Sequence, residues 1–128
     1  MSMAGSLDHF ENFYSSYVDF RNVDAWLPPG YEQKDERYPV LYMHDGQNIF
    51  DHPSAFGGES WRVDQAMTRL IDEEKIRGAI VVGIWNSPLR WREYMPQKPY
   101  EASALQKHHP LILERAGGPP LSNAYLNF

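Results

Sequence analysis

Two short apolar segments, residues 39–43 and residues 79–84, constrain the fold of this chain most strongly. Neither shows the alternation of apolar and polar residues that a half-exposed strand has, so we predict two strands buried on both faces. Between them, residues 61–73 repeat apolar side chains at helical spacing, namely Val63, Met67, Leu70 and Ile71. This pattern predicts one amphipathic helix, with Ser60 as its N-cap and Gly78 just beyond its end. The order strand, helix, strand predicts a right-handed β-α-β crossover in a parallel or mixed sheet.

The segments on either side of this crossover carry weaker signals. Residues 10–20 and 23–27 are rich in aromatic and β-branched residues, and we predict that they form a hairpin of two strands. Residues 85–120 show no long periodicity and contain many prolines, which predicts a long loop with one helical turn at residues 110–116. Ser122 is a candidate cap for the start of a further helix. The expected architecture is therefore an α/β sheet of about four strands, one clear amphipathic helix, a long loop and the start of a further helix.

Composition narrows the class of protein. Of the 128 residues, 42% are hydrophobic, 14% aromatic and 23% charged, which is typical of a globular protein with a single domain over residues 1–128. The formal net charge of −5 argues against a nucleic-acid partner. The absence of cysteine excludes disulfides, thiolate zinc sites and cysteine nucleophiles. Because no apolar run is long enough for a membrane span and residues 1–8 lack a signal-peptide pattern, we expect a cytoplasmic protein without a membrane partner.

The first apolar strand runs directly into a loop of small and amide-bearing residues, Gly46, Gln47 and Asn48. In open α/β sheets the ligand site lies at the carboxyl ends of the strands, and a loop there can direct backbone N–H groups at a developing negative charge. Without a Cβ, Gly46 would tolerate a positive φ and a close approach to substrate. Alternatively, Asp45 and Gly46 form a plain strand-ending turn in which Asn48 hydrogen-bonds its own backbone. On these residues alone, the plain turn is the better interpretation.

Four sequence motifs, taken in their order along the chain, favour the ligand-binding loop over the plain turn. "YPVLYMHDGQN" is followed by "AFGGESWRVDQAMTRLI", "AIVVGIWNSPLRWREYMP" and "LSNAYLNF", and from about Tyr17 onward the chain resembles the putative-esterase family of the α/β-hydrolases, relatives of enterochelin and carbohydrate esterases. The resemblance implies the N-terminal half of an α/β-hydrolase domain. It also implies that the Gln47 N–H is one donor of an oxyanion hole, with Asn48 near it. The family's serine, acid and histidine have no counterpart here, since the 128 residues contain no Gly-x-Ser-x-Gly, and we assign no catalytic residue.

Polar and aromatic side chains near the ends of both apolar strands are candidates for a substrate pocket. They are His44, Asp45, Trp85, Asn86, Arg90, Glu93 and Tyr94. An ion pair between Arg90 and Glu93 would hold the second loop in shape, and the aromatic side chains would offer flat surface to an aromatic or sugar ring. Packing within the loop explains the same residues equally well.

Other clusters of polar residues do not indicate a site. The spacing of His44, Asp45, Asp51 and His52 matches no metal-binding motif, so we expect no metal and no cofactor. Ser60 lacks the glycine that follows a nucleophilic serine, and it suits a helix cap better. We assign no catalytic role to His108 or His109, because no nucleophile stands beside them.

Two functions stay open on the sequence. The first is an esterase-type serine hydrolase that acts on carboxylic or carbohydrate esters, with the oxyanion loop in this chain and the triad outside it. The second is a non-catalytic binding protein, or a truncated fragment, that keeps an aromatic-lined pocket for a small-molecule ester. The resemblance also implies that residues 39–43 lie at an edge of the sheet here, so we expect self-association or binding of a complementing fragment through this strand.

Overall fold

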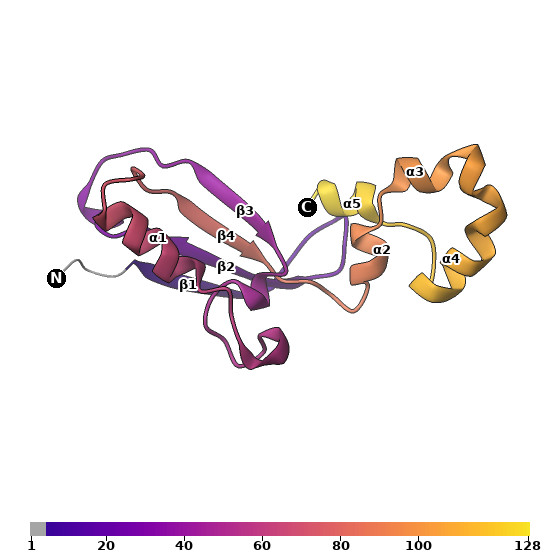
Figure 1. The fold of residues 1–128 in the computed structure, drawn as a ribbon, viewed down its shortest axis with the longest axis horizontal. Coiled ribbons are helices and arrows are strands. Elements are labelled where there is room, and N and C mark those ends of the chain that lie inside the picture. The colour runs from indigo at the N-terminus through magenta and orange to yellow at the C-terminus, as the bar shows by residue number, and fades with distance from the viewer. Residues whose placement is uncertain (1–4) are drawn as a thin grey trace. The chain divides into compact units, whose positions relative to one another are not determined.

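The structure, a computed structural model, describes residues 5–128 and divides into two compact units. The first unit comprises residues 5–13 and Arg21–Asn86, and the second comprises Tyr14–Phe20 and Ser87–Phe128. The first unit contains the four strands and helix α1 (Val63–Asp72), and the second contains the remaining α-helices (Figure 1).

The strands form one mixed sheet in the order β1-β2-β4-β3. Their bounds are β1 (Ser6–Phe13), β2 (Arg21–Leu27), β3 (Val40–His44) and β4 (Ile80–Ile84). β2 pairs antiparallel with both β1 and β4, whereas β3 and β4 pair in parallel. The two apolar segments of the sequence therefore form neighbouring parallel strands, joined through α1 as predicted. The α/β architecture with four strands is confirmed.

The predicted hairpin is present, but its first strand was placed wrongly at residues 10–20. β1 ends at Phe13, and its register pairs Ser6 with Leu27 and Phe10 with Val23. Every residue of β1 is exposed. Aromatic content therefore misled the prediction, because backbone pairing with β2 selects this segment rather than burial of apolar side chains.

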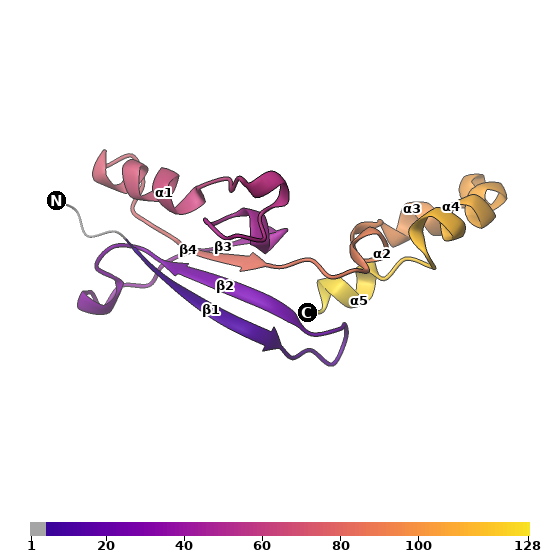
Figure 2. The same ribbon diagram turned by 90° about the horizontal axis from the view of Figure 1, so that it is seen from below.

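Helix α1 covers one face of the sheet (Figure 2), and the core lies between the helix and that face. It consists of five buried side chains, Trp26, Ile49, Phe50, Met67 and Val81. The helix takes part through Met67, which belongs to the apolar stripe that predicted it. The core therefore holds together β2, β4, α1 and the segment that follows β3.

The start of α1 differs from the prediction. Ser60 does not cap the helix; its hydroxyl is buried and makes no hydrogen bond within residues 5–128. The chain instead enters the helix through Arg62 in the left-handed conformation, with φ 52° and ψ 46°. The Val63 N–H donates to the Ile49 carbonyl at 3.1 Å. Backbone from the loop after β3 therefore supplies an acceptor that a capping side chain would otherwise provide.

β3 is an outer strand of the sheet and pairs on one side only within the described residues. Leu41 is 46% exposed and Tyr42 is 68% exposed. Burial on both faces, which the apolar pattern predicted, is therefore wrong for β3. β4 lies between β2 and β3, and its Val81 is completely buried. The sheet edge that the resemblance implied is the arrangement found.

The second unit is helical where the sequence predicted a long loop. It contains α2 (Arg90–Tyr94), α3 (Gln97–Glu101), a 3-10 helix (Ser103–His108), α4 (His109–Ala116) and α5 (Ser122–Leu126). The expected turn at residues 110–116 is part of α4. α2, α3 and the 3-10 helix are too short to show apolar periodicity, which is why the prediction missed them, whereas α5 is the further helix whose start the sequence predicted. Within residues 5–128, no helix has both the length and the apolar character that crossing a bilayer requires.

Ser122 begins α5 but is not its cap. The residue before the helix is Leu121, and the Ser122 hydroxyl accepts a hydrogen bond from the Gln97 N–H at 3.1 Å. Ser122 is buried. Its hydroxyl therefore links α5 to the start of α3 within the second unit.

Candidate functional site

The loop after β3, residues 45–48, is a single turn of 3-10 helix and is called the Gln47 loop here. The turn spans Gly46–Asn48 and is preceded by Asp45 in the left-handed conformation, with φ 55° and ψ 48°. The Asn48 N–H donates to the Asp45 carbonyl at 2.9 Å. Among residues 5–128, no acceptor is found for the Gln47 N–H. Of these two neighbouring amides, the one at Gln47 therefore makes no hydrogen bond to residues 5–128.

Gly46 is needed for a reason other than the predicted one. It does not have a positive φ; the left-handed residue in this loop is Asp45. A Cβ on Gly46 would instead lie 2.7 Å from the carbonyl carbon and oxygen of Gly83 and 2.8 Å from the carbonyl carbon of Ile84. The loop therefore sits directly on the backbone of β4, and only glycine leaves room for that approach.

Asn86, two residues beyond the end of β4, ties the Gln47 loop to that strand. Its backbone N–H donates to Gln47 Oε1 at 3.2 Å, and its side-chain Nδ2 donates to Asp45 Oδ1 at 2.7 Å. The second bond stabilises the left-handed Asp45, a conformation that costs about 1–3 kcal/mol for a residue other than glycine. The carboxyl ends of β3 and β4 thus meet as the sequence predicted, and Asn86 is the residue that joins them.

Asn48 has a structural role in the described residues. Its Oδ1 accepts a hydrogen bond from the Phe56 N–H at 2.8 Å, and its carbonyl accepts one from the Trp61 N–H at 2.7 Å. The side chain thus binds backbone eight residues further along rather than forming the plain local turn considered above. Asn48 fixes the segment that leads from the Gln47 loop to α1.

The candidate residues fall into the two units. His44, Asp45, Trp85 and Asn86 belong to the first unit with the Gln47 loop, and His44 is the exposed last residue of β3. Arg90, Glu93 and Tyr94 belong to α2 in the second unit. There the Arg90 guanidinium lies 4.9 Å from the centre of the Tyr94 ring, a cation–π contact, and Glu93 is only 1% exposed. These side chains therefore pack within the second unit, and their place in a substrate pocket stays a prediction.

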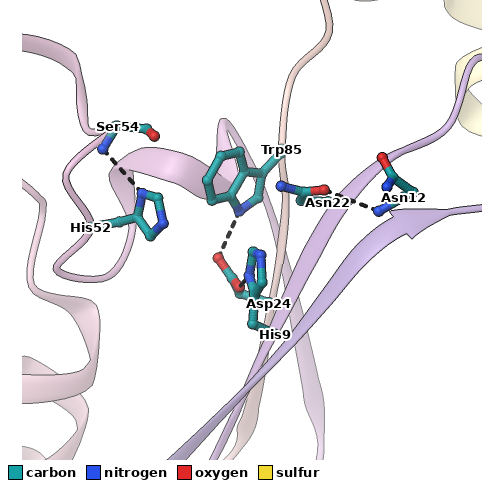
Figure 3. A network of polar contacts seen from close by, with 7 residues as sticks. All are labelled: His9, Asn12, Asn22, Asp24, His52, Ser54 and Trp85. Atoms are coloured by element: carbon teal, nitrogen blue, oxygen red, sulfur yellow. Dashed lines mark hydrogen bonds and ion pairs between the residues drawn. The ribbon is translucent and has the colours of Figure 1, made fainter.

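The sequence analysis missed a polar network around the buried carboxylate of Asp24 (Figure 3). Asp24 of β2 is 4% exposed, and its carboxylate contacts His9 Nδ1 of β1 and accepts a hydrogen bond from Trp85 Nε1 at 2.7 Å. The His52 ring packs edge-on against Trp85, with 4.8 Å between ring centres. An acidic residue inside a predicted strand was the available signal, because a buried carboxylate needs partners.

The remaining sequence candidates do not form a reactive site. Within the described part of the chain, no group of three or more His, Asp or Glu side chains is placed to hold a metal. His52 Nδ1 accepts a hydrogen bond from the Ser54 N–H at 3.0 Å. His109 stacks on Tyr100 with 4.0 Å between ring centres, and its Nε2 donates to the Tyr100 carbonyl at 2.6 Å. These contacts are structural.

The mixed four-stranded sheet, with a helix crossing between its two parallel strands, has the fold of an α/β-hydrolase-like fragment. The family described as "Putative esterase" matches residues 18–108. This match covers more than half of the chain, and the chain therefore belongs to that family.

Two solved structures are similar to this chain. One is a crystal structure of an IroE-like serine hydrolase from Shewanella oneidensis, with a TM-score of 0.61, 23% identity, and coverage of 97% of this chain and 34% of that one. Another is a ferulic acid esterase, with a TM-score of 0.49, 24% identity, and coverage of 89% of this chain and 45% of that one. No curated protein matches the chain. The chain thus spans less than half the length of either structure.

Proposed function

We propose that this chain carries the oxyanion-binding part of a carboxylic-ester hydrolase and that the Gln47 N–H is one of the donors. The observation that carries the proposal is the geometry of the Gln47 loop, which holds an amide with no acceptor among residues 5–128 at the carboxyl ends of two parallel strands. Attack on an ester carbonyl places negative charge on its oxygen, and a fixed donor stabilises that charge without reorganisation. Loss of one such donor typically raises the barrier by about 2.7–4 kcal/mol.

The proposed chemistry is acyl transfer through a serine, assisted by a histidine and an acid. The 128 residues contain no Gly-x-Ser-x-Gly, so in this proposal the triad comes from another polypeptide segment. The contribution of the present chain is the donor and part of the pocket. The substrate class is a small-molecule ester, as membership of an esterase family suggests.

A titration with a small oxyanion tests the donor without requiring turnover. Acetate or methylphosphonate added to the labelled chain should shift the Gln47 amide resonance in ¹H–¹⁵N spectra more than that of Asn48, whose N–H already donates to Asp45. Gln47→Ala keeps the backbone N–H, so the amide resonance of the new alanine should still shift when the anion is added. Gln47→Pro removes the donor, and residual shifts at Asn48 and Asn86 should disappear. Shifts that persist in the proline variant would contradict the assignment.

An esterase assay tests the assignment of the triad. The chain, with an intact mass that shows it to end at Phe128, should not hydrolyse p-nitrophenyl acetate above the rate in buffer. Hydrolysis by this chain would mean that a nucleophile lies within the 128 residues. Anion binding without hydrolysis, even after a triad-bearing segment of a related esterase has been added, would favour the non-catalytic binding protein.

We also propose that a second copy of the chain pairs with the free edge of β3. Edge strands that avoid such pairing usually carry charges, prolines or bulges, and Val40–His44 contains no Lys, Arg, Asp or Glu. A two-fold, antiparallel pairing centred on Tyr42 would place Leu41 opposite Met43 of the other copy. Apolar side chains would then meet across the interface, and each β3 would gain a second neighbouring strand for its backbone hydrogen bonds.

Sedimentation velocity over a range of concentrations tests this pairing. The unmodified chain should show a dimer that dissociates on dilution. Tyr42→Lys should be monomeric, because the two lysines would face each other across the axis. Phe56→Lys is the matched control, since Phe56 is also in the first unit and is 89% exposed, and it should leave the dimer intact. A monomer at every concentration, or equal dissociation of both variants, would contradict the pairing.

A further inference from the structure

The buried carboxylate of Asp24 has no role in the site as described so far. Both of its oxygens are occupied: Oδ1 contacts His9 Nδ1, and Oδ2 accepts the hydrogen bond from Trp85 Nε1 (Figure 3). Burial of a charge is costly, and apolar side chains of similar size commonly replace buried ion pairs without loss of stability. A buried carboxylate at this position therefore calls for an explanation other than packing.

The partners of Asp24 connect it to the Gln47 loop. Trp85 is the first residue after β4, and the next residue, Asn86, makes both hydrogen bonds to the loop. The Asp24 carboxylate accepts a hydrogen bond from the indole N–H of Trp85, while the backbone N–H of Trp85 donates to the Asn22 carbonyl at 3.1 Å. Trp85 is thus held to β2 by its side chain and by its backbone, so that the chain leaves β4 in one direction.

The backbone pairing of β2 with β4 gives a second connection between Asp24 and the Gln47 loop. Asp24 is the register partner of Gly83, and Gly83 is the residue on which Gly46 packs. The Gln47 loop therefore packs on a part of β4 that is paired with β2. Asp24 of β2 also binds the side chain of Trp85, the residue directly after β4, at the same end of the strand.

We propose that Asp24 is a positioning residue for the Gln47 loop: by holding the Trp85 indole it sets the path of Asn86, and Asn86 in turn fixes Asp45 and Gln47. The proposal rests on the proposed function, in which the Gln47 N–H is the donor. Asp24 does not touch a substrate in this arrangement. Its effect reaches the donor through Trp85 and Asn86.

Hydrogen exchange of single amides separates positioning from general stability. The Asn86 N–H donates to Gln47 Oε1 at the loop end of β4, whereas the Ile80 N–H donates to the Pro39 carbonyl at the other end of the same strand. In Asp24→Leu, the Asn86 amide should exchange about tenfold faster or more, as expected for loss of a hydrogen bond to a charged group. The Ile80 amide should exchange at an unchanged rate.

Three further variants complete the test. Asp24→Asn keeps an oxygen acceptor for Trp85 Nε1 and should restore most of the protection at Asn86. Trp85→Phe removes the donor and should reproduce the effect of Asp24→Leu, and it serves as the second variant where Asp24→Leu does not fold. Asp8→Leu changes an exposed carboxylate on the neighbouring β1 and should leave both amides unaffected.

The outcomes decide between the alternatives. Faster exchange at Asn86 and Ile80 by the same factor would show that Asp24 only stabilises the sheet and would overturn the proposal, as would no change at Asn86. The oxyanion titration of the unmodified chain tests the Gln47 donor independently of the hydrogen-exchange experiment. If Gln47 does not respond to anions while Asn86 responds to the Asp24 variants, the proposed function fails and the coupling stands.

Discussion

Replacement of Gly46 by alanine should displace the Gln47 loop or destabilise the first unit. The new Cβ would lie 2.7 Å from two backbone atoms of Gly83 and 2.8 Å from one of Ile84. Because these are main-chain atoms of the central strand β4, no side-chain rotation relieves the clash. Forcing an extra methyl group into a packed site typically costs about 1–3 kcal/mol.

A smaller opposing effect has to be subtracted. Because Gly46 has no positive φ, alanine suits its backbone conformation and restricts the unfolded chain, which commonly contributes about 0.4–1 kcal/mol of stability. The net loss should be about 1–2 kcal/mol by this reasoning. With a urea dependence of about 1–3 kcal/mol per molar, the unfolding midpoint should fall by about 0.3–2 M.

Urea unfolding should be combined with ¹H–¹⁵N spectra of Gly46→Ala. Gly57→Ala is an informative comparison, since a Cβ there meets nothing within 4 Å but φ is +70°. That variant should cost about 1–2 kcal/mol through backbone conformation alone and leave the Asn86 resonance unchanged. An unchanged midpoint for Gly46→Ala, together with unchanged Gln47 and Asn86 resonances, would refute the close approach between the loop and β4.

Two further substitutions test the surroundings of the loop. Gly83→Ala should cost about 1–3 kcal/mol in a urea titration, because the new Cβ would lie 3.0 Å from the tip of the buried Ile49 side chain and 3.3 Å from the Cα of Gly46, a main-chain atom. An unchanged unfolding midpoint would show that both the Ile49 side chain and the Gln47 loop can move away from the new methyl group. Asn48→Ala removes the acceptor for the Phe56 N–H and should cost about 0.5–1.5 kcal/mol, with faster hydrogen exchange at the Phe56 amide. Unchanged exchange at Phe56 would show that this hydrogen bond does not hold the segment.

The central part of the fold could be predicted because its signals are local and strong. The apolar runs that became β3 and β4 and the stripe that includes Met67 are long enough to define their elements. The position of the Gln47 loop follows from them, because a loop after a parallel strand lies at the carboxyl edge of the sheet. The location of β1 could not be predicted in this way, since pairing with β2 selects Ser6–Phe13 as the strand, whereas aromatic content favoured residues 10–20.

The detailed site was beyond prediction for a related reason. The contacts that define it join residues far apart in sequence, such as Gly46 with Gly83 and Asp24 with Trp85. Sequence patterns report periodicity within a segment, whereas these contacts depend on the register between strands. Helices α2 and α3 of the second unit could not be predicted for a different reason, because a helix of five residues contains too few residues to establish a period.

The position of the Gln47 N–H follows from the core rather than from the loop alone. The loop includes a left-handed Asp45, which is unfavourable for a residue with a side chain, so its conformation has to be imposed by its surroundings. Close packing on Gly83 and the two hydrogen bonds from Asn86 impose it, and all of these contacts come from β4 or the residues directly after it. β4 is in turn fixed by the burial of Val81 in the core beneath α1. A donor held in this way is preorganised, which is the property that stabilisation of a developing oxyanion requires.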